Sequence, residues 1–180
     1  MKPRITLLFI ILCLTIIMNG CHPKENNEIN EKQEKESESK LIPVIMNDPR
    51  VNVPWTKIRE VKVDLDSDSK EESLGLYTTA ERDKKGNLMW DDGQKWLLFA
   101  QNEKKYYVLF SEYVQLGSVY FTVSKYSNDE IPKVTVIVST GANLKLKNYS
   151  YDKDKQGYKE ESIYDSQVIN LLFTSIPNYN

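Results

Sequence analysis

The amino-acid pattern predicts a mainly β protein: a single antiparallel β domain, built as a sandwich or a strongly bent sheet. Short runs of alternating apolar residues recur after residue 40, and Gly, Asn, Asp or Pro turn signals bound them. Aromatic and β-branched residues fill these runs, and the chain holds 11 tyrosines. About eight strands fit this stretch, fewer than a propeller of several four-stranded blades requires. The pattern also leaves room for one or two short helices.

The expected strands begin after an extended lead-in. Prolines at positions 43, 49 and 54 punctuate this lead-in, and Trp55 is the first large apolar anchor expected in the core. Strands are expected over residues 58–65, 74–78, 96–100, 106–110, 113–124, 133–139 and 144–151. Turns are expected over residues 84–87, 91–93, 101–105 and 152–157. The last apolar run, residues 168–173, fits a helix or a buried strand equally well.

The N-terminal segment is typical of a secretory signal peptide. Lys2 and Arg4 give it a positive start, and residues 5–18 (ITLLFIILCLTIIM) carry no charge. At 1.5 Å per residue, a helix over these residues would be about 21 Å long. The hydrocarbon core of a bilayer is about 30 Å thick, so the segment is short for a spanning helix.

The end of this segment, Met18-Asn19-Gly20-Cys21, resembles the lipobox of bacterial lipoproteins. In that family the cysteine sulfur receives a diacylglyceryl group, and the signal peptide is cut just before the cysteine. The resemblance implies that residues 1–20 are removed and that Cys21 carries the lipid, with palmitate-type acyl chains. Two acyl chains hold a protein stably at a bilayer, so the mature protein is expected at the extracytoplasmic face of the cell membrane. The alternative is an ordinary signal peptide, or an uncleaved anchor, with an incidental cysteine.

A charged spacer is expected between this cysteine and the domain. Residues 22–40 hold six glutamates, four lysines and one large apolar residue, Ile29. Such a composition cannot bury enough apolar surface to offset the entropy of ordering it. We therefore expect residues 21–40 to form a lipidated, disordered tether and residues 41–180 to form the β domain. The only histidine, His22, lies in the tether.

An acidic run from Asp64 to Glu72 (DLDSDSKEE) carries the most specific signal of the mature chain. Asp64, Asp66 and Asp68 occupy positions 1, 3 and 5, a spacing that lets their carboxylates converge on one cation. Calcium needs six to eight oxygen ligands, and the main-chain carbonyl of Lys70 and the carboxylate of Glu72 add to the three aspartates. Two interpretations of this run stay open: a solvent-exposed acidic turn, and a calcium site with a dissociation constant on the order of 10⁻⁴–10⁻³ M.

This acidic run resembles the D-x-D-x-D-G-x-x-[DE] loop of FG-GAP and VCBS-type repeats and, more loosely, the loops of dockerins and EF-hands. The resemblance covers about ten residues, occurs once in the chain and implies ligand roles for the four acidic residues at matching positions. Ser69 replaces the glycine of that loop, and Gly75 stands where an EF-hand has its bidentate glutamate. The alternative is an acidic turn that side-chain hydrogen bonds to the backbone close.

The mature chain offers few catalytic groups. Apart from Cys21 and His22 it lacks cysteine and histidine, which excludes Ser-His-Asp and Cys-His catalysis and the commonest zinc ligands. A glycosidase needs only two carboxylates. The acidic residues nominated for such a pair are Asp91, Asp92, Glu103 and Glu112.

The overall pattern favours a non-enzymatic binding or interaction module over an enzyme. The expected partners are the membrane, through the lipid, and an unidentified ligand or protein of the cell envelope. Nucleic acid is not expected, because 24 basic residues against 26 acidic ones leave no basic footprint. The aromatic residues fit a β core, with Trp90 beside a turn as the expected exception. Two alternatives stay open: a glycan-acting envelope enzyme with a carboxylate pair, and an inhibitor or immunity-type lipoprotein.

Overall fold

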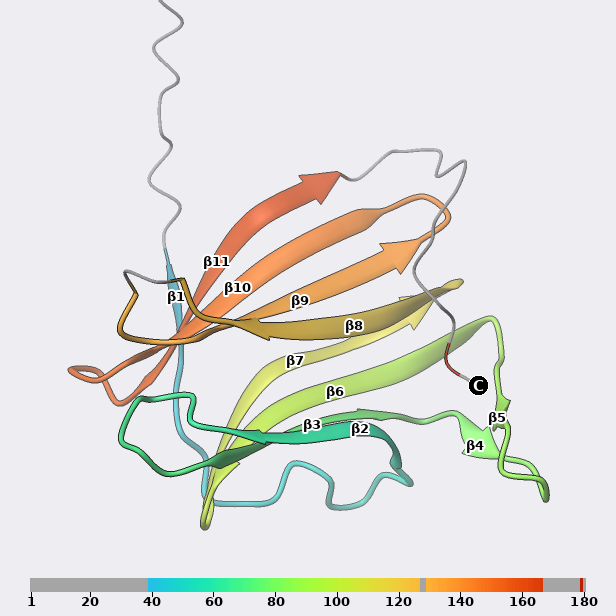
Figure 1. Ribbon diagram of the computed structural model, residues 1–180. Helices are drawn as coiled ribbons and strands as arrows, with labels where there is room; N and C mark the ends of the chain where they lie inside the picture. Colours follow the sequence, from blue (N-terminus) through green and yellow to red (C-terminus); the bar gives the residue numbers. More distant parts are fainter. Residues whose placement is uncertain (1–38, 127–128, 167–178, 180) are drawn as a thin grey trace, which may run out of the picture. The chain divides into compact units, whose positions relative to one another are not determined.

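The protein is an all-β domain, as the sequence predicts. The computed structural model describes residues 39–126, 129–166 and 179, and every strand pair in it is antiparallel (Figure 1). These residues contain no helix, so the short helices for which the pattern left room are absent from the described part of the chain. None of them forms a helix with the length and apolar character needed to cross a bilayer. The apolar run 168–173 lies outside the described residues.

The larger sheet has five strands in the order β1-β11-β10-β9-β8. Its strands are β1 (Lys40–Ile42), β8 (Gly117–Ser124), β9 (Lys133–Thr140), β10 (Leu144–Asp152) and β11 (Gly157–Ser166). Strands β8 to β11 follow one another as a meander, and β1 adds to the far edge. The alternation of buried Val134, Val136 and Val138 along β9 gives this sheet one apolar face.

The second sheet has four strands in the order β2-β3-β6-β7. Its strands are β2 (Thr56–Val63), β3 (Glu72–Thr78), β6 (Gly93–Asn102) and β7 (Lys105–Gln115). A small hairpin of β4 (Glu81–Arg82) and β5 (Leu88–Met89) lies between β3 and β6 in the sequence. The central residues of β6, 96–100, are all apolar and buried because both faces of the strand are covered there. One face contributes to the main core, and Leu97 and Phe99 on the other join Tyr77 in a second cluster.

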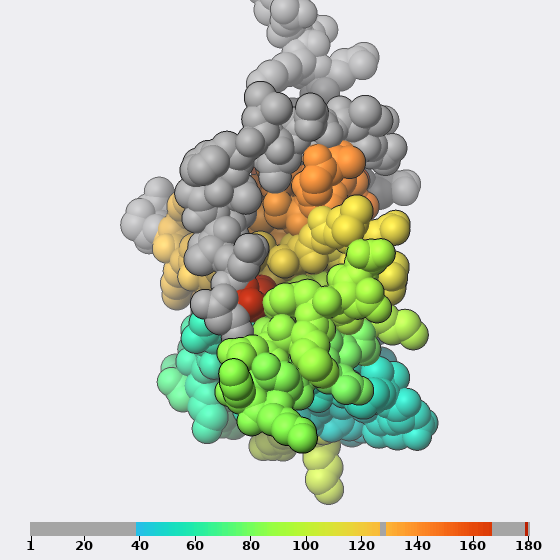
Figure 2. Space-filling view, turned by 90° about the vertical axis from the view of Figure 1, so that its right-hand side faces the viewer, coloured from blue at the N-terminus to red at the C-terminus, as the bar shows by residue number. Residues whose placement is uncertain are grey.

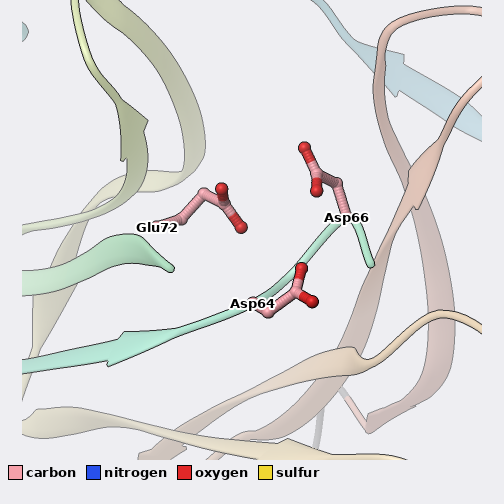
Figure 3. A group of neighbouring side chains, drawn as sticks. All are labelled: Asp64, Asp66 and Glu72. Atoms are coloured by element: carbon pink, nitrogen blue, oxygen red, sulfur yellow. The ribbon is translucent and has the colours of Figure 1, made fainter. Parts of the chain in front are cut away.

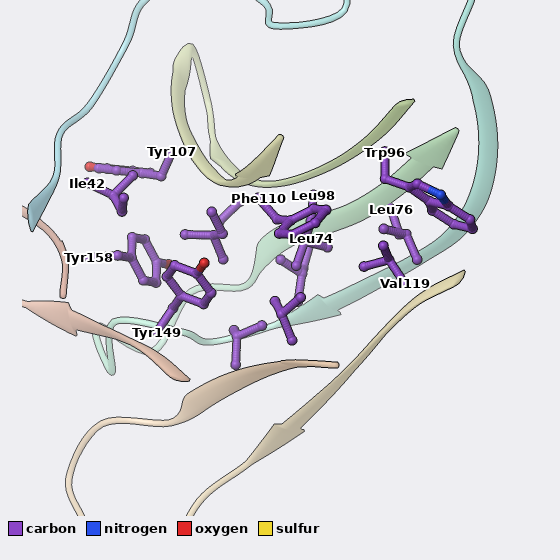
Figure 4. Close-up of a cluster of buried hydrophobic side chains, with 14 of the residues drawn as sticks. Ile42, Leu74, Leu76, Trp96, Leu98, Tyr107, Phe110, Val119, Tyr149 and Tyr158 are labelled. Carbon is purple, nitrogen blue, oxygen red and sulfur yellow. The ribbon is translucent and has the colours of Figure 1, made fainter. Parts of the chain in front are cut away.

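The main core lies between the two sheets, which makes the domain a β-sandwich (Figure 4). Each sheet contributes inward-facing apolar side chains, as strand alternation requires. Tyrosine rings pack edge to face at one end of this core, where the ring centroid of Tyr107 lies 5.2 Å from that of Tyr158 and 6.0 Å from that of Tyr151. The largest fully buried side chains of the two clusters are Trp96, Tyr149, Tyr158, Phe99, Leu65, Leu74, Leu76, Leu97, Leu98, Val119, Val134 and Val136.

One side of the sandwich is closed by backbone pairing, and the other side is not. After β1, Ile45 crosses to β7, where its N–H lies 2.8 Å from the carbonyl oxygen of Tyr106 and its own carbonyl oxygen accepts from the Tyr106 N–H at 2.9 Å. On the opposite side β2 and β8 are the last strands of their sheets. Within the described residues no strand pairs with their outer edges, so two sheet edges border this open side (Figure 1).

Three sequence-based expectations need correction. The run expected as one strand over residues 113–124 is split between β7 and β8, because Leu116 has a φ of 49° and Gly117 passes so close to Ser139 that a Cβ atom would collide with its carbonyl oxygen. The strand expected over 58–65 ends at Val63, and Leu65 is buried in the following loop instead. Strands β1, β4, β5 and β11 were not expected.

Candidate metal centre

The acidic loop connects β2 to β3 at one end of the sandwich. Hydrogen bonds from its own backbone shape it: Asp64 accepts from the N–H groups of Asp68 at 3.1 Å and Ser69 at 3.0 Å. Asp66 also accepts from the Asp68 N–H, at 3.0 Å. These are the side-chain-to-backbone bonds that close an acidic turn, and they also hold the carboxylates on the inside of the loop.

Serine at position 69 does not prevent the sharp turn that glycine makes in the resembling loops. Ser69 has a φ of 72°, and Ser67 has a φ of 56°. Both values lie in the left-handed region, which glycine enters at no steric cost and other residues enter at a cost of about 1–2 kcal/mol. The loop therefore makes a left-handed turn at Ser69 without a glycine.

Three of the five predicted ligands lie together. Carboxylate oxygens of Asp64, Asp66 and Glu72 all lie within 4.8 Å of one another, and Figure 3 shows the three groups facing a common space. Asp68 is not in this group, and ligation by the main-chain carbonyl of Lys70 stays a prediction. Asp68 is exposed and accepts from the Lys70 N–H at 2.8 Å, so it closes the outer turn of the loop.

Glu72 is the structural centre of the cluster. It is the first residue of β3, only 2% exposed, and its Oε2 accepts from the buried N–H of Leu65 at 2.7 Å. Its other oxygen accepts from the side-chain amide of Asn102 at 3.1 Å. Desolvation raises the pKa of Glu72 above its ordinary value, and the neighbouring aspartates raise it further, although the bond from Leu65 acts in the opposite direction.

Negative charge accumulates at this end of the sandwich. The pKa of Asp66 is raised as well, first by desolvation and then by the charges of Asp68 and Asp64. One cation lies nearby: Lys153 places its Nζ 3.4 Å from the carbonyl oxygen of Ser67, and its charge lowers the pKa of Asp66 in part. Each of the three clustered carboxylates offers an oxygen, the donor atom that calcium prefers.

The carboxylates nominated for a glycosidase pair do not gather in this way. Asp91, Asp92 and Glu103 are exposed residues of turns. Glu112 lies 3.9 Å from the Nζ of Lys147, which in turn makes a 2.9 Å ion pair with Glu160.

The expectation for Trp90 and Trp96 is confirmed, whereas Tyr113, also expected in the core, is 61% exposed. Trp96 is fully buried in the main core, and Trp90 is 40% exposed beside the turn that leads into β6. The two rings stack with centroids 5.7 Å apart and an angle of 17° between their planes. Trp90 is therefore a partly exposed aromatic ring that is held in place by a buried one.

The predicted lipidation site at Cys21 lies outside the described residues, as do the rest of the lipobox, His22 and nearly all of the expected tether. The comparisons with known proteins assign no family to the chain: no family model, no curated protein and no solved structure matches it.

Proposed function

We propose that this protein is a lipid-anchored binding module at the extracytoplasmic face of a cell membrane, and that calcium stabilises its β-sandwich. The convergence of Asp64, Asp66 and Glu72 is the observation that carries the calcium part of the proposal. The anchor part rests on the lipobox-like residues that end at Cys21.

Calcium would act here as a structural ion. Two of the three carboxylates have raised pKa values because burial and like charges oppose their ionisation. A divalent cation among them replaces this repulsion with attraction, and it ties the end of β2 to the start of β3. Through Asn102, the same ion would also brace the hairpin between β6 and β7. In this role the calcium ion would stabilise the fold and would not take part in a chemical reaction.

We expect calcium to raise the thermal midpoint of the full chain by about 5 °C at 10 mM. With a dissociation constant of about 1 mM, mass action stabilises the folded state by about 1.4 kcal/mol, and a domain of this size gains about 3–4 °C per kcal/mol. The measurement is calorimetric unfolding across a calcium series, with magnesium in parallel. Asp66→Asn should lose the rise.

Asp91→Asn is the matched control for this experiment. It removes one acidic charge from an exposed turn outside the cluster, so the calcium response should stay at the wild-type size. An equal response in both variants would mean that calcium screens the overall charge, and the site would be rejected.

The proposed lipid anchor is tested by a separate experiment. Replacing Cys21 with alanine should abolish incorporation of labelled palmitate and release the protein from the membrane fraction of producing cells, because the only lipidated sulfur is lost. Cys13→Ala is the control, since Cys13 lies within the signal peptide and should leave both readouts unchanged. Persistent labelling of the Cys21→Ala protein would contradict the lipobox assignment.

A further inference from the structure

The open side of the sandwich contains an apolar groove. Its volume is about 750 Å³, and its two walls are the edge strands β2 and β8. This volume is within the range of sites for small-molecule ligands. The apolar side chains that line it are Ile58, Val61, Val63, Leu88, Phe121 and Val123.

The groove has two different ends. The loops that follow β2 and β8 meet, because the Ser67 hydroxyl donates to the carbonyl oxygen of Glu130 at 2.6 Å. The two strands therefore run side by side in the same direction, and Val63 lies with Val123 at the end near the acidic loop (Figure 1). At the other end the lining residues include Arg59 of β2 and Arg82 of β4. With a rise of about 3.3 Å per residue, roughly 13 Å of apolar wall separates Arg59 from Val63.

The positive charge at this end is not neutralised by neighbouring acids. Among the described residues, no acidic side chain lines the groove, and neither arginine forms an ion pair. Arg82 donates one Nη hydrogen to the carbonyl oxygen of Gly86 at 2.6 Å, which fixes its side chain but leaves its charge. Both arginines thus line the groove and offer positive charge to an anion.

Tyr179 borders the charged end. Its ring stacks on Tyr120 with centroids 5.0 Å apart, and its hydroxyl donates to the carbonyl oxygen of Val119 at 2.9 Å. Its own carbonyl oxygen accepts from the indole N–H of Trp90 at 3.3 Å. Figure 2 shows this face, with the red surface of residue 179 against the green surface of the β4–β5 segment. The aromatic residues therefore add a rigid wall beside the arginines.

We infer that the groove binds a fatty acid, with its carboxylate at Arg59 and Arg82 and the first part of its acyl chain between β2 and β8 toward Val63. The order of groups in the ligand matches the order of side chains along the groove. Its anionic carboxylate would lie at the arginines, and its methylene groups would lie along the apolar side chains. Burial of each methylene contributes about 0.8 kcal/mol. The inference names a ligand for the binding module proposed above and rests on that part of the proposal; it does not use the calcium cluster.

An acyl chain fits this groove better than an acidic peptide does. Beyond the arginine end, the described side chains that line the groove are apolar except for the hydroxyl of Thr122. A peptide would bring a polar backbone group at every residue into this space. The unpaired edges of β2 and β8 could pair with some of these groups, but those that face the apolar side chains would stay unpaired, which costs free energy. An acyl chain brings no such groups.

The test measures binding of 11-(dansylamino)undecanoic acid to the full chain by fluorescence, with the corresponding alcohol as the uncharged probe. The acid should bind more tightly than the alcohol. Arg59→Gln and Arg82→Gln should each weaken binding of the acid by about three- to fivefold, as expected for partly solvated ion pairs, and leave binding of the alcohol unchanged. Unlabelled palmitate should displace the probe.

Lys62→Gln is the matched control, because it removes one positive charge from the same strand at an exposed position outside the groove. It should bind the acid as the wild type does. Equal affinities in all three variants, or equal affinities for acid and alcohol, would overturn the inference, as would displacement by an acidic peptide and not by palmitate. A calcium-dependent rise in the thermal midpoint without fatty-acid binding would reject the groove and leave the calcium-stabilised module intact.

Discussion

Replacing Trp96 with alanine is expected to lower the free energy of unfolding by about 3–5 kcal/mol. Its indole is fully buried between the two sheets, and it packs on Trp90 and on Tyr179, whose ring centroids lie 5.7 Å and 5.9 Å away. Truncation removes the apolar burial of a large ring and leaves a cavity that the surrounding strands can fill only in part. Denaturant unfolding monitored by tyrosine fluorescence and circular dichroism measures the change.

Two further variants keep this prediction testable if the alanine variant fails to fold. Trp96→Phe should cost clearly less, because it keeps an aromatic ring and removes an indole N–H that has no hydrogen-bond partner among the described residues. Trp90→Ala, at a 40% exposed position, should cost less than Trp96→Ala. A Trp90→Ala effect as large as that of Trp96→Ala would contradict the assignment of Trp96 as the core residue.

The sequence was sufficient to predict strands wherever one face of the strand is buried. On β9, buried residues recur at every second position, whereas β3 is buried at nearly every position; both strands were expected at nearly their observed places. Strand β11 was missed because its sequence is mostly polar: Glu161 to Asp165 are all exposed, and its pairing with β1 and β10 holds it in the sheet. The residues of β11 alone do not indicate this pairing, since the partner strands are formed by other segments of the chain.

The candidate site was predictable in part for a similar reason. The spacing of Asp64, Asp66 and Glu72 determines their convergence, because one loop carries all three. The sequence did not indicate that Glu72 is buried and accepts from Leu65, or that Asn102 reaches it from another hairpin. These contacts depend on how the β2–β3 and β6–β7 connections lie at one end of the sandwich. The groove between β2 and β8 was not predictable either, because it depends on the strand order that makes these two strands the edges of their sheets.

Glu72→Ala is expected to lower the free energy of unfolding by about 2–3 kcal/mol without calcium. The substitution leaves the N–H of Leu65 without an acceptor in the protein interior, and an orphaned buried donor costs about 1–3 kcal/mol. Asn102 loses its acceptor as well. Glu72→Gln should be much less destabilising, because its amide oxygen can still accept from Leu65 while the buried charge is removed. Both variants should lose the calcium response, which separates the structural role of the side chain from its role as a ligand.

The contribution of Glu72 to folding stability depends on pH because its pKa is raised. The direction of this dependence differs with and without calcium. Desolvation is the main cause of the raised pKa, so the folded protein holds this proton more tightly than the unfolded chain does. Without calcium, the contribution of Glu72 to stability is therefore full below the unfolded carboxyl pKa and is lost as pH rises through the folded pKa. Calcium binds the ionised carboxylate, so the calcium-induced rise in midpoint should instead shrink as pH falls through the same range.

The difference between wild type and Glu72→Gln isolates this carboxylate from the others. Asp48, Glu60 and Asp152 have lowered pKa values, because hydrogen bonds with Arg50, Lys57 and Lys159 respectively favour their ionised forms, and they contribute a pH dependence of the opposite sign. Their contribution is common to both proteins and cancels in the difference. We therefore expect the wild type to lose stability relative to Glu72→Gln as pH rises in a calcium-free buffer, and to regain it when calcium is added. A difference that is independent of pH would show that Glu72 is not destabilised by ionisation, and would remove the electrostatic reason for a cation at this loop.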